Sequence, residues 1–184
     1  MKKRYFAIPI LAIALHFLLS NLLYFLVERL VLDVFHIPPQ QFMKHSYWGE
    51  ILIYAVLILA FFTLYKLLWR KEISEPRTAT NFKDVLGSLV VGFGICGISG
   101  LWIMLAEQLP SLQKSVEAMN AGTENIAGGN AFGTFMIAVI AAPVVEEILF
   151  RGIVLRSMRK FTPTWAAILI SSVLFGVYHL NIVQ

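Results

Sequence analysis

The sequence predicts an all-α fold, a polytopic membrane helix bundle with about five transmembrane helices, and three observations lead to this class. The chain of 184 residues is 58% hydrophobic and only 14% charged, whereas an ordinary soluble domain is roughly 25% charged. Long stretches carry no Asp, Glu, Lys or Arg, and a membrane-spanning helix needs about 20 mostly apolar residues. These stretches do not alternate apolar and polar residues as membrane-spanning barrel strands do. We therefore expect an integral, multi-pass membrane protein in contact with the lipid bilayer.

The charge-free stretches locate the helices. They cover residues 5–27, 51–65, 85–106, 125–145 and 161–184. Extended to the neighbouring turn signals, they predict five helices in a single transmembrane domain over 1–184, at about 5–28, 48–69, 84–106, 130–160 and 163–184. The first helix is longer than the apolar part of a signal peptide, so we expect an uncleaved anchor.

Basic residues are distributed unevenly among the segments that join these helices. Alternate segments hold twelve and three of the fifteen Lys and Arg residues, and cytoplasmic segments of membrane proteins carry the excess. The N-terminus, 70–83 and 151–162 are therefore expected in the cytoplasm, and the connection at Ile37-Pro38-Pro39 and the segment 120–130 outside. We expect a bacterial plasma membrane protein with a cytoplasmic N-terminus.

The excess of basic residues does not predict a nucleic-acid partner. The formal net charge is +4, but a DNA-binding surface needs a solvated basic face, which so apolar a chain does not offer. The single cysteine, Cys96, allows no internal disulfide.

The helix at 84–106 is rich in small residues. Gly92, Cys96 and Gly100 recur at intervals of four, and small faces let membrane helices approach closely. We therefore expect this face to pack against a neighbouring helix. A second interpretation stays open, because Gly97-Ile98-Ser99-Gly100 fits the G-x-S-G pattern around the nucleophile of rhomboid serine proteases, which would make Ser99 catalytic.

A polar stripe runs along the first helix, where His16, Ser20 and Tyr24 recur at intervals of four. Polar groups in lipid turn toward the bundle and find hydrogen-bond partners there. We therefore expect these three side chains to face the interior of the bundle and to form hydrogen bonds there, rather than to bind a ligand.

Two adjacent carboxylates interrupt the apolar helix at 130–160. Charges on a membrane helix are costly unless they are paired or wetted. Arg151 stands four residues after Glu147, close enough for an ion pair inside the bundle, whereas Glu146 lies about 100° round the helix without a local partner. Alternatively, both glutamates mark the solvated cytoplasmic end of a shorter helix.

The position of His179 decides between these two interpretations. If the helix ended at Glu146, His179 would lie about 24 Å along the next helix, and the two side chains could not meet. If the helix continues to Lys160, with Phe161-Thr162-Pro163 as the turn, both side chains stand about 21 Å from that turn. A deep carboxylate facing a deep imidazole across an antiparallel hairpin is a functional-site hypothesis.

These residues resemble two motifs of a known family. Glu146-Glu147-x-x-x-Arg151 followed by Phe175-x-x-x-His179 is similar to the first two motifs of the CPBP family, the CAAX proteases and bacteriocin-processing enzymes. Phe150-Arg151-Gly152 and Phe175-Gly176 fit as well. The resemblance covers about 143–181, and the preceding helices match only as generic membrane spans.

The resemblance implies a hydrolase, an intramembrane glutamic or metallo-endopeptidase. Glu146 would activate the attacking water, His179 would orient that water or bind metal, and Glu147, Arg151 and Phe175 would support the site. The implied cofactor is a divalent metal, zinc, with His179 and Glu146 as ligands, although a zinc site normally has three protein ligands. The implied substrate is a peptide or protein, either a prenylated protein or a bacteriocin precursor.

The sequence departs from the later motifs of the family, in which a second histidine is followed four residues later by Asn or Asp. No such motif occurs in these residues, which end at Gln184, and Asn181 cannot supply it because it lies about 200° round a helix from His179. We expect an incomplete chain that lacks C-terminal helices and is inactive as it stands. An alternative is a non-catalytic immunity or scaffold protein that keeps the glutamate–histidine hairpin for structure.

Overall fold

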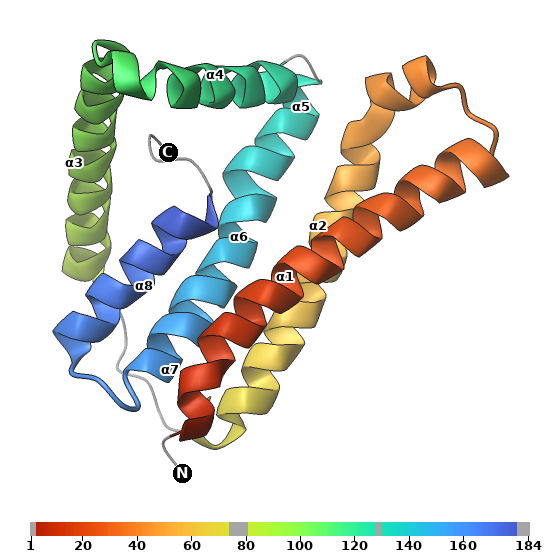
Figure 1. Ribbon diagram of the computed structural model, residues 1–184. Helices are drawn as coiled ribbons and strands as arrows, with labels where there is room; N and C mark the ends of the chain where they lie inside the picture. Colours follow the sequence, from red (N-terminus) through yellow and green to blue (C-terminus); the bar gives the residue numbers. More distant parts are fainter. Residues whose placement is uncertain (1–2, 74–80, 128–129, 180–184) are drawn as a thin grey trace.

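The computed structural model describes residues 3–73, 81–127 and 130–179, and every regular element within them is a helix (Figure 1), which confirms the all-α class. The first element, α1 (Lys3–Arg29), continues into the π-helical segment η1 (Leu30–Val34). After a short connection, α2 (Pro39–Ile73) runs back along α1, with non-helical backbone at Trp69 (φ −114°, ψ 19°). Both helices extend further than the sequence predicts.

The next elements stand to one side of this helix pair. They are α3 (Phe82–Glu107), the 3-10 turn η2 (Pro110–Leu112) and α4 (Gln113–Ala127). The charge-free stretches do not predict α4. The main contacts of α3 are with η2 and α4.

Close packing of the small-residue face of α3 is not found where side chains are described. A Cβ atom at Gly94, Gly97 or Gly100 would meet no atom within 4 Å. The prediction is therefore wrong at Gly100, and the environments of Gly92 and Cys96 lie outside the described residues.

One long helical path runs from Ala131 to Met158. It comprises α5 (Ala131–Thr134), η3 (Phe135–Ala141), α6 (Ala142–Glu146), η4 (Glu147–Leu155) and α7 (Arg156–Met158), of which η3 and η4 are π-helical. The path begins at Asn130, whose side chain accepts a hydrogen bond from the Phe132 N–H at 2.8 Å. Pro143 has no N–H to donate to the carbonyl four residues earlier, and π-helical segments commonly accommodate such interruptions.

A tight turn joins this path to the last helix, α8 (Thr164–Tyr178). The Met158 carbonyl accepts hydrogen bonds from both the N–H and the hydroxyl of Thr162, each at 2.9 Å. Pro163 then takes an extended conformation (φ −63°, ψ 154°) and precedes the first residue of α8. The path thus continues well past the glutamates before it turns, as the hairpin hypothesis requires.

The core lies between α1, α2 and the path from Ala131 to Met158. Two stripes of buried side chains form it: Ile53, Leu57 and Phe61 on α2, and Val145, Leu149 and Ile153 on α6 and η4. Each stripe recurs at intervals of four residues, the spacing of one helix face. Lipid tails are as apolar as these side chains, so the stripes stabilise a membrane bundle through close packing rather than through removal from water.

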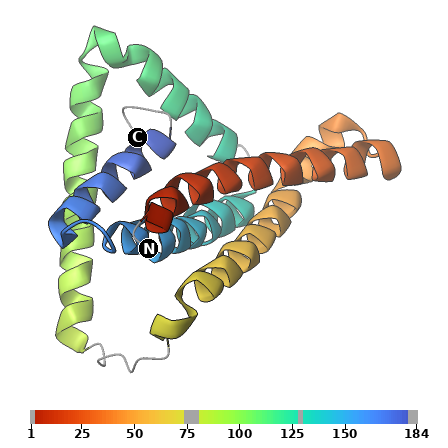
Figure 2. The ribbon, with the colours of Figure 1, turned by 60° about the horizontal axis from the view of Figure 1, so that its bottom comes forward.

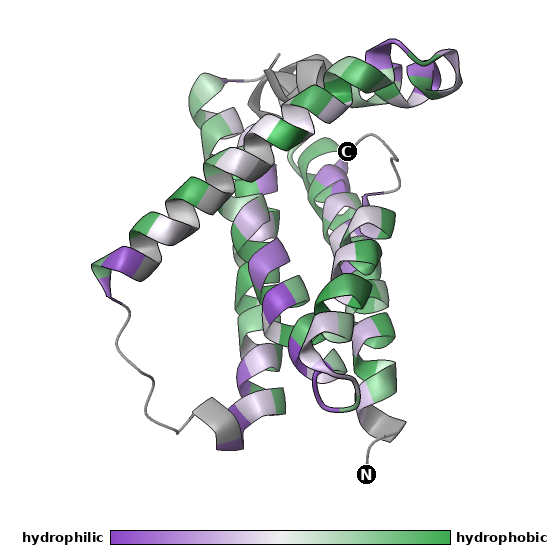
Figure 3. Ribbon diagram, turned by 90° about the vertical axis from the view of Figure 1, so that its left-hand side faces the viewer, coloured by the Kyte–Doolittle hydropathy of each residue, from purple (hydrophilic) through white to green (hydrophobic). Residues whose placement is uncertain are grey.

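Two described helices, Tyr5–Val34 and Tyr47–Lys71, are long and apolar enough to cross a membrane. The apolar helices Gly97–Glu107 and Thr164–Tyr178 are shorter, so the number of five spans stays a prediction. Figure 3 shows hydrophobic residues along much of the length of the helices. On α1, large apolar side chains face outward, for example Leu18, which is 69% exposed, as expected of a surface covered by lipid.

The two ends of the bundle separate the expected cytoplasmic and outward segments. The start of α1 and the turn before α8 lie together at one end (Figures 1 and 2), where the rings of Phe6 and Phe161 are 5.9 Å apart. At the other end lies α4 (Figure 1). This arrangement agrees with the alternation of basic residues along the sequence. Which end faces the cytoplasm stays a prediction.

Candidate active site

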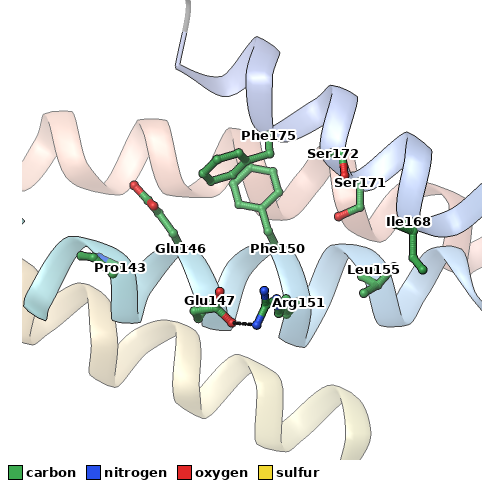
Figure 4. Close-up of a pocket in the computed structure, with 10 residues that line it drawn as sticks. All are labelled: Pro143, Glu146, Glu147, Phe150, Arg151, Leu155, Ile168, Ser171, Ser172 and Phe175. Atoms are coloured by element: carbon green, nitrogen blue, oxygen red, sulfur yellow. Dashed lines mark ion pairs between the residues drawn. The ribbon is translucent and has the colours of Figure 1, made fainter. Parts of the chain in front are cut away.

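A cavity of about 500 Å³ opens between the helical path and α8 (Figure 4). Charged groups from Glu146, Glu147 and Arg151 line it, together with the rings of Phe150 and Phe175. Both motifs of the predicted site therefore contribute to one cavity, although α6, η4 and α8 are separate elements. Ser171 and Ser172 of α8 add hydroxyl groups to its wall.

Glu146 stands at the point where the helical path changes from α to π geometry. It is the last residue of α6, and Glu147 is the first of η4. The Glu146 side chain is half-buried, lines the cavity, and leaves the helix on a different side from the Glu147–Arg151 pair (Figure 4). Within the described part of the chain, its carboxylate makes no hydrogen bond and no ion pair. The carboxylate is thus available to a water molecule or a substrate.

Two tyrosines that the sequence does not single out lie near this carboxylate. The hydroxyl groups of Tyr54 on α2 and Tyr178 on α8 are within electrostatic reach of Glu146. Tyr54 belongs to no motif, and Tyr178 occupies an unspecified position within Phe175-x-x-x-His179. Helix packing brings both tyrosines near Glu146.

Glu147 and Arg151 form the ion pair that their spacing predicts, with 3.1 Å between a carboxylate oxygen and a guanidinium nitrogen. The expectation that this pair is enclosed in the bundle is wrong. The Glu147 side chain is 56% exposed and that of Arg151 is 76% exposed, because both line the open cavity rather than the packed stripe on the other side of the helix. The pair can therefore meet a bound molecule.

Contacts between aromatic rings set the axial register of α8 against the helical path, that is, which residues of the two helices lie opposite one another. The ring of Phe150 packs edge to face against Phe175, with centroids 4.9 Å apart, and lies 5.2 Å from Tyr178. Phe150 follows Glu146 by four residues, and Phe175 precedes His179 by four. The contact therefore confirms the hairpin register in which positions 146 and 179 stand at nearly equal height.

His179 caps the C-terminal end of α8. Its ring lies edge-on to Phe175, with centroids 4.8 Å apart, and Phe175 lines the cavity. The His179 ring is not among the groups that line the cavity itself. The Phe175 ring therefore stands between the imidazole of His179 and the cavity. A direct contact of His179 with Glu146 stays a prediction.

Gly152 allows a close approach between η4 and α2. A Cβ atom at this position would lie 3.1 Å from the Tyr65 ring, tighter than ordinary van der Waals contact. Tyr65 in turn accepts a hydrogen bond from the Arg156 guanidinium at 2.9 Å. Each residue of the Phe150-Arg151-Gly152 segment thus has a physical role. Phe150 packs against Phe175, Arg151 pairs with Glu147, and Gly152 lets α2 come close.

Ser99 is not part of this cavity. Its side chain is exposed on α3, and α3 packs mainly against η2 and α4 rather than against the path that carries the glutamates. The structure therefore gives no support to a serine nucleophile at this position.

The described residues do not offer a complete zinc site. Within 3–73, 81–127 and 130–179, no group of three or more His, Cys, Asp and Glu side chains is placed to hold a metal ion. A catalytic zinc normally has three protein ligands and a water, and Glu146 with His179 falls short of that set. Zinc binding stays a prediction.

An apolar helix bundle with carboxylates facing a cavity defines a class of membrane protein that has a functional site within the bundle. In line with this class, residues 128–184 match the family model described as Rce1-like, type II CAAX prenyl endopeptidase. This match confirms the resemblance to the CAAX proteases, and that family is membrane-embedded. No significant match was found among curated proteins or among solved structures.

Proposed function

We propose that this protein is an intramembrane endopeptidase of the CAAX-protease type, which hydrolyses a peptide bond near the membrane with a water activated by Glu146. One observation carries the proposal: the Glu146 carboxylate, which pairs with no group among the described residues, lines a cavity in the segment that matches the Rce1-like family. A carboxylate inside an apolar bundle is costly, and a catalytic role accounts for that cost.

The reaction follows from the chemistry of a carboxylate base. Glu146 would take a proton from a water in the cavity, and the water oxygen would attack the carbonyl carbon of the peptide bond. The proton would then pass from Glu146 to the leaving amine nitrogen as the carbon–nitrogen bond breaks. General acid–base catalysis of this kind contributes about 10²–10⁴-fold in rate.

The remaining residues would act on the water and on the substrate. His179 would orient the water, as the family resemblance implies. The Glu147–Arg151 pair presents a guanidinium at the cavity, and a guanidinium offers several donors to carbonyl or carboxylate oxygens. The apolar wall of Phe150, Phe175 and Ile168 would hold an apolar side chain or a lipid-modified residue. A prenylated protein is therefore our first choice of substrate, and a bacteriocin precursor is the second.

The test is a cleavage assay on the full-length protein in membranes, with a fluorogenic prenylated peptide and with a bacteriocin precursor. Glu146→Gln keeps the shape of the side chain but removes the base, so cleavage should fall by about 10²–10⁴-fold. Ser99→Ala is the matched control and should leave cleavage unchanged. Cleavage that survives Glu146→Gln would overturn the proposal, and a wild-type protein that cleaves neither substrate would favour the non-catalytic alternative.

Treatment with a chelator distinguishes a metal-free mechanism from one that depends on zinc. A water activated by Glu146 without metal predicts that cleavage persists in excess 1,10-phenanthroline. Loss of cleavage that zinc restores would show instead that groups outside the described residues complete a metal site.

A further inference from the structure

A hydrogen bond joins the first helix of the bundle to the last. The hydroxyl oxygen of Tyr178 lies 3.2 Å from Nδ1 and 3.4 Å from Nε2 of His16. His16 is only 7% exposed, and the two residues are 162 positions apart in the sequence. This contact links α1 directly to the end of α8.

The other surroundings of His16 are apolar or already bonded. Its ring packs against Phe61 and Phe17, with centroids 5.6 and 6.1 Å away. The nearby hydroxyl of Ser20 donates to the backbone carbonyl of His16 rather than to its ring. Among the described residues, Tyr178 is therefore the side chain that hydrogen-bonds to the buried imidazole, and a polar group left without a partner in such a place is destabilising.

Tyr178 occupies a position from which it can control the proposed site. It is the last residue of α8, and His179 follows it directly. Its ring packs against Phe150 at 5.2 Å and its hydroxyl lies within electrostatic reach of Glu146. Three elements, α1, η4 and α8, thus meet at one tyrosine next to the proposed catalytic pair.

Within the described residues, ring contacts attach the last turns of α8 on one face: Phe175 and Tyr178 pack against Phe150, and Tyr178 also packs against Phe17. Val173 and Val177 are 57% and 63% exposed, and the last turn of a helix lacks partners for its carbonyl groups and frays readily. The hydrogen bond between Tyr178 and His16 adds a directional contact at the residue next to His179.

We propose that His16 is a positioning residue for the active site: through its hydrogen bond to Tyr178 it fixes the end of α8 and thereby the orientation of His179 relative to Glu146. The catalytic part of this inference rests on the proposed function, whereas the anchoring part does not. A site whose reacting groups are misplaced by about 1 Å loses about 10²-fold in rate, so a lost anchor should lower kcat more than it raises KM.

The experiment uses two readouts on the same variants of the full-length protein. Tyr178→Phe keeps the ring and removes the hydroxyl, His16→Leu removes the partner, and His16→Gln restores a hydrogen-bonding side chain. Ser20→Ala is the matched control, because it removes a hydroxyl one turn further along α1 whose hydrogen bonds stay within that helix.

The first readout measures anchoring without any reference to catalysis. In a Cys96→Ala background, spin labels at Asn21 and Val177, both exposed, report the distance between α1 and the end of α8. We expect a broader distance distribution for Tyr178→Phe and His16→Leu, and an unchanged one for Ser20→Ala and His16→Gln. An unchanged distribution for all four variants would overturn the proposal.

The second readout is the kinetics of peptide cleavage. We expect kcat to fall about tenfold for Tyr178→Phe and His16→Leu with KM nearly unchanged, in keeping with a loss of positioning. A broadened distribution with unchanged kcat would overturn the positioning role. A broadened distribution in a protein whose wild type cleaves no peptide would contradict the proposed function and leave the anchor supported.

Discussion

The rings of Phe150 and Phe175 meet edge to face, at 4.9 Å between centroids and 89° between planes. Phe150 belongs to the helical path that carries both glutamates, and Phe175 to the helix that ends before His179. The contact therefore holds the two halves of the candidate site at a common level, and it also forms part of the cavity wall.

Phe175→Ala should loosen this contact and destabilise the hairpin. Edge-to-face pairs contribute about 0.5–1.5 kcal/mol beyond the burial of the rings, so a lower melting temperature is expected in detergent micelles. Val173→Ala on an exposed face of the same helix is the control and should have little effect. Equal losses for both variants would show that the ring contact has no special role.

Arg151→Ala tests whether the ion pair acts on the substrate or on the fold. Exposed pairs contribute only about 0–1 kcal/mol to stability, and both side chains of this pair are more than half exposed. We therefore expect unchanged abundance in membranes and reduced cleavage. A sharp fall in abundance, recovered in the double variant Glu147→Gln with Arg151→Gln, would mean that the pair is enclosed in the membrane and acts on folding.

Two glycines of the family motifs should respond oppositely to the same substitution. Gly152→Ala places a methyl group 3.1 Å from the Tyr65 ring, and overpacking of this kind typically costs about 1–3 kcal/mol. At Gly176 a Cβ would meet nothing within 4 Å, so Gly176→Ala should stabilise the helix by about 0.5–1 kcal/mol. Thermal unfolding of the two variants measures both effects, and a stabilised Gly152→Ala would contradict the close approach of α2.

Topology can be tested with an impermeant thiol reagent on intact cells. In a Cys96→Ala background, a cysteine at Lys114 should be labelled and one at Arg159 should not, because the excess of basic residues places 151–162 in the cytoplasm. Both positions are exposed, so access within the folded chain does not decide the result. Labelling at Arg159 alone would reverse the orientation.

The hairpin could be predicted from the sequence because its geometry follows from few quantities. The rise per residue of a helix is fixed, and the turn residues before Thr164 locate its end, so the level of His179 relative to Glu146 follows. Pro143 likewise offers a local signal for irregular helix geometry, although the π-helical form itself could not be read from it.

Other parts of the site depend on packing that has no local signal. Tyr54 comes near Glu146, and His16 forms a hydrogen bond with Tyr178, only because α1 and α2 lie against the later helices. The polar stripe was expected to find partners, and it does so at His16, but the partner could not be named from the sequence. The polar composition of α4 gives no charge-free stretch, so the sequence does not predict this helix.

The central claim is that the side chains at positions 146 and 179 face one another across the hairpin, and cross-linking tests it most directly. In a Cys96→Ala background, the pair Glu146→Cys with His179→Cys should be joined rapidly by a short bifunctional thiosulfonate. The control pair, Val144→Cys with His179→Cys, should react slowly, because position 144 lies about 200° round the helix from position 146. Rapid cross-linking of 146 with 179 is the result we predict. Slow reaction of that pair, or faster reaction of the control pair, would contradict the site.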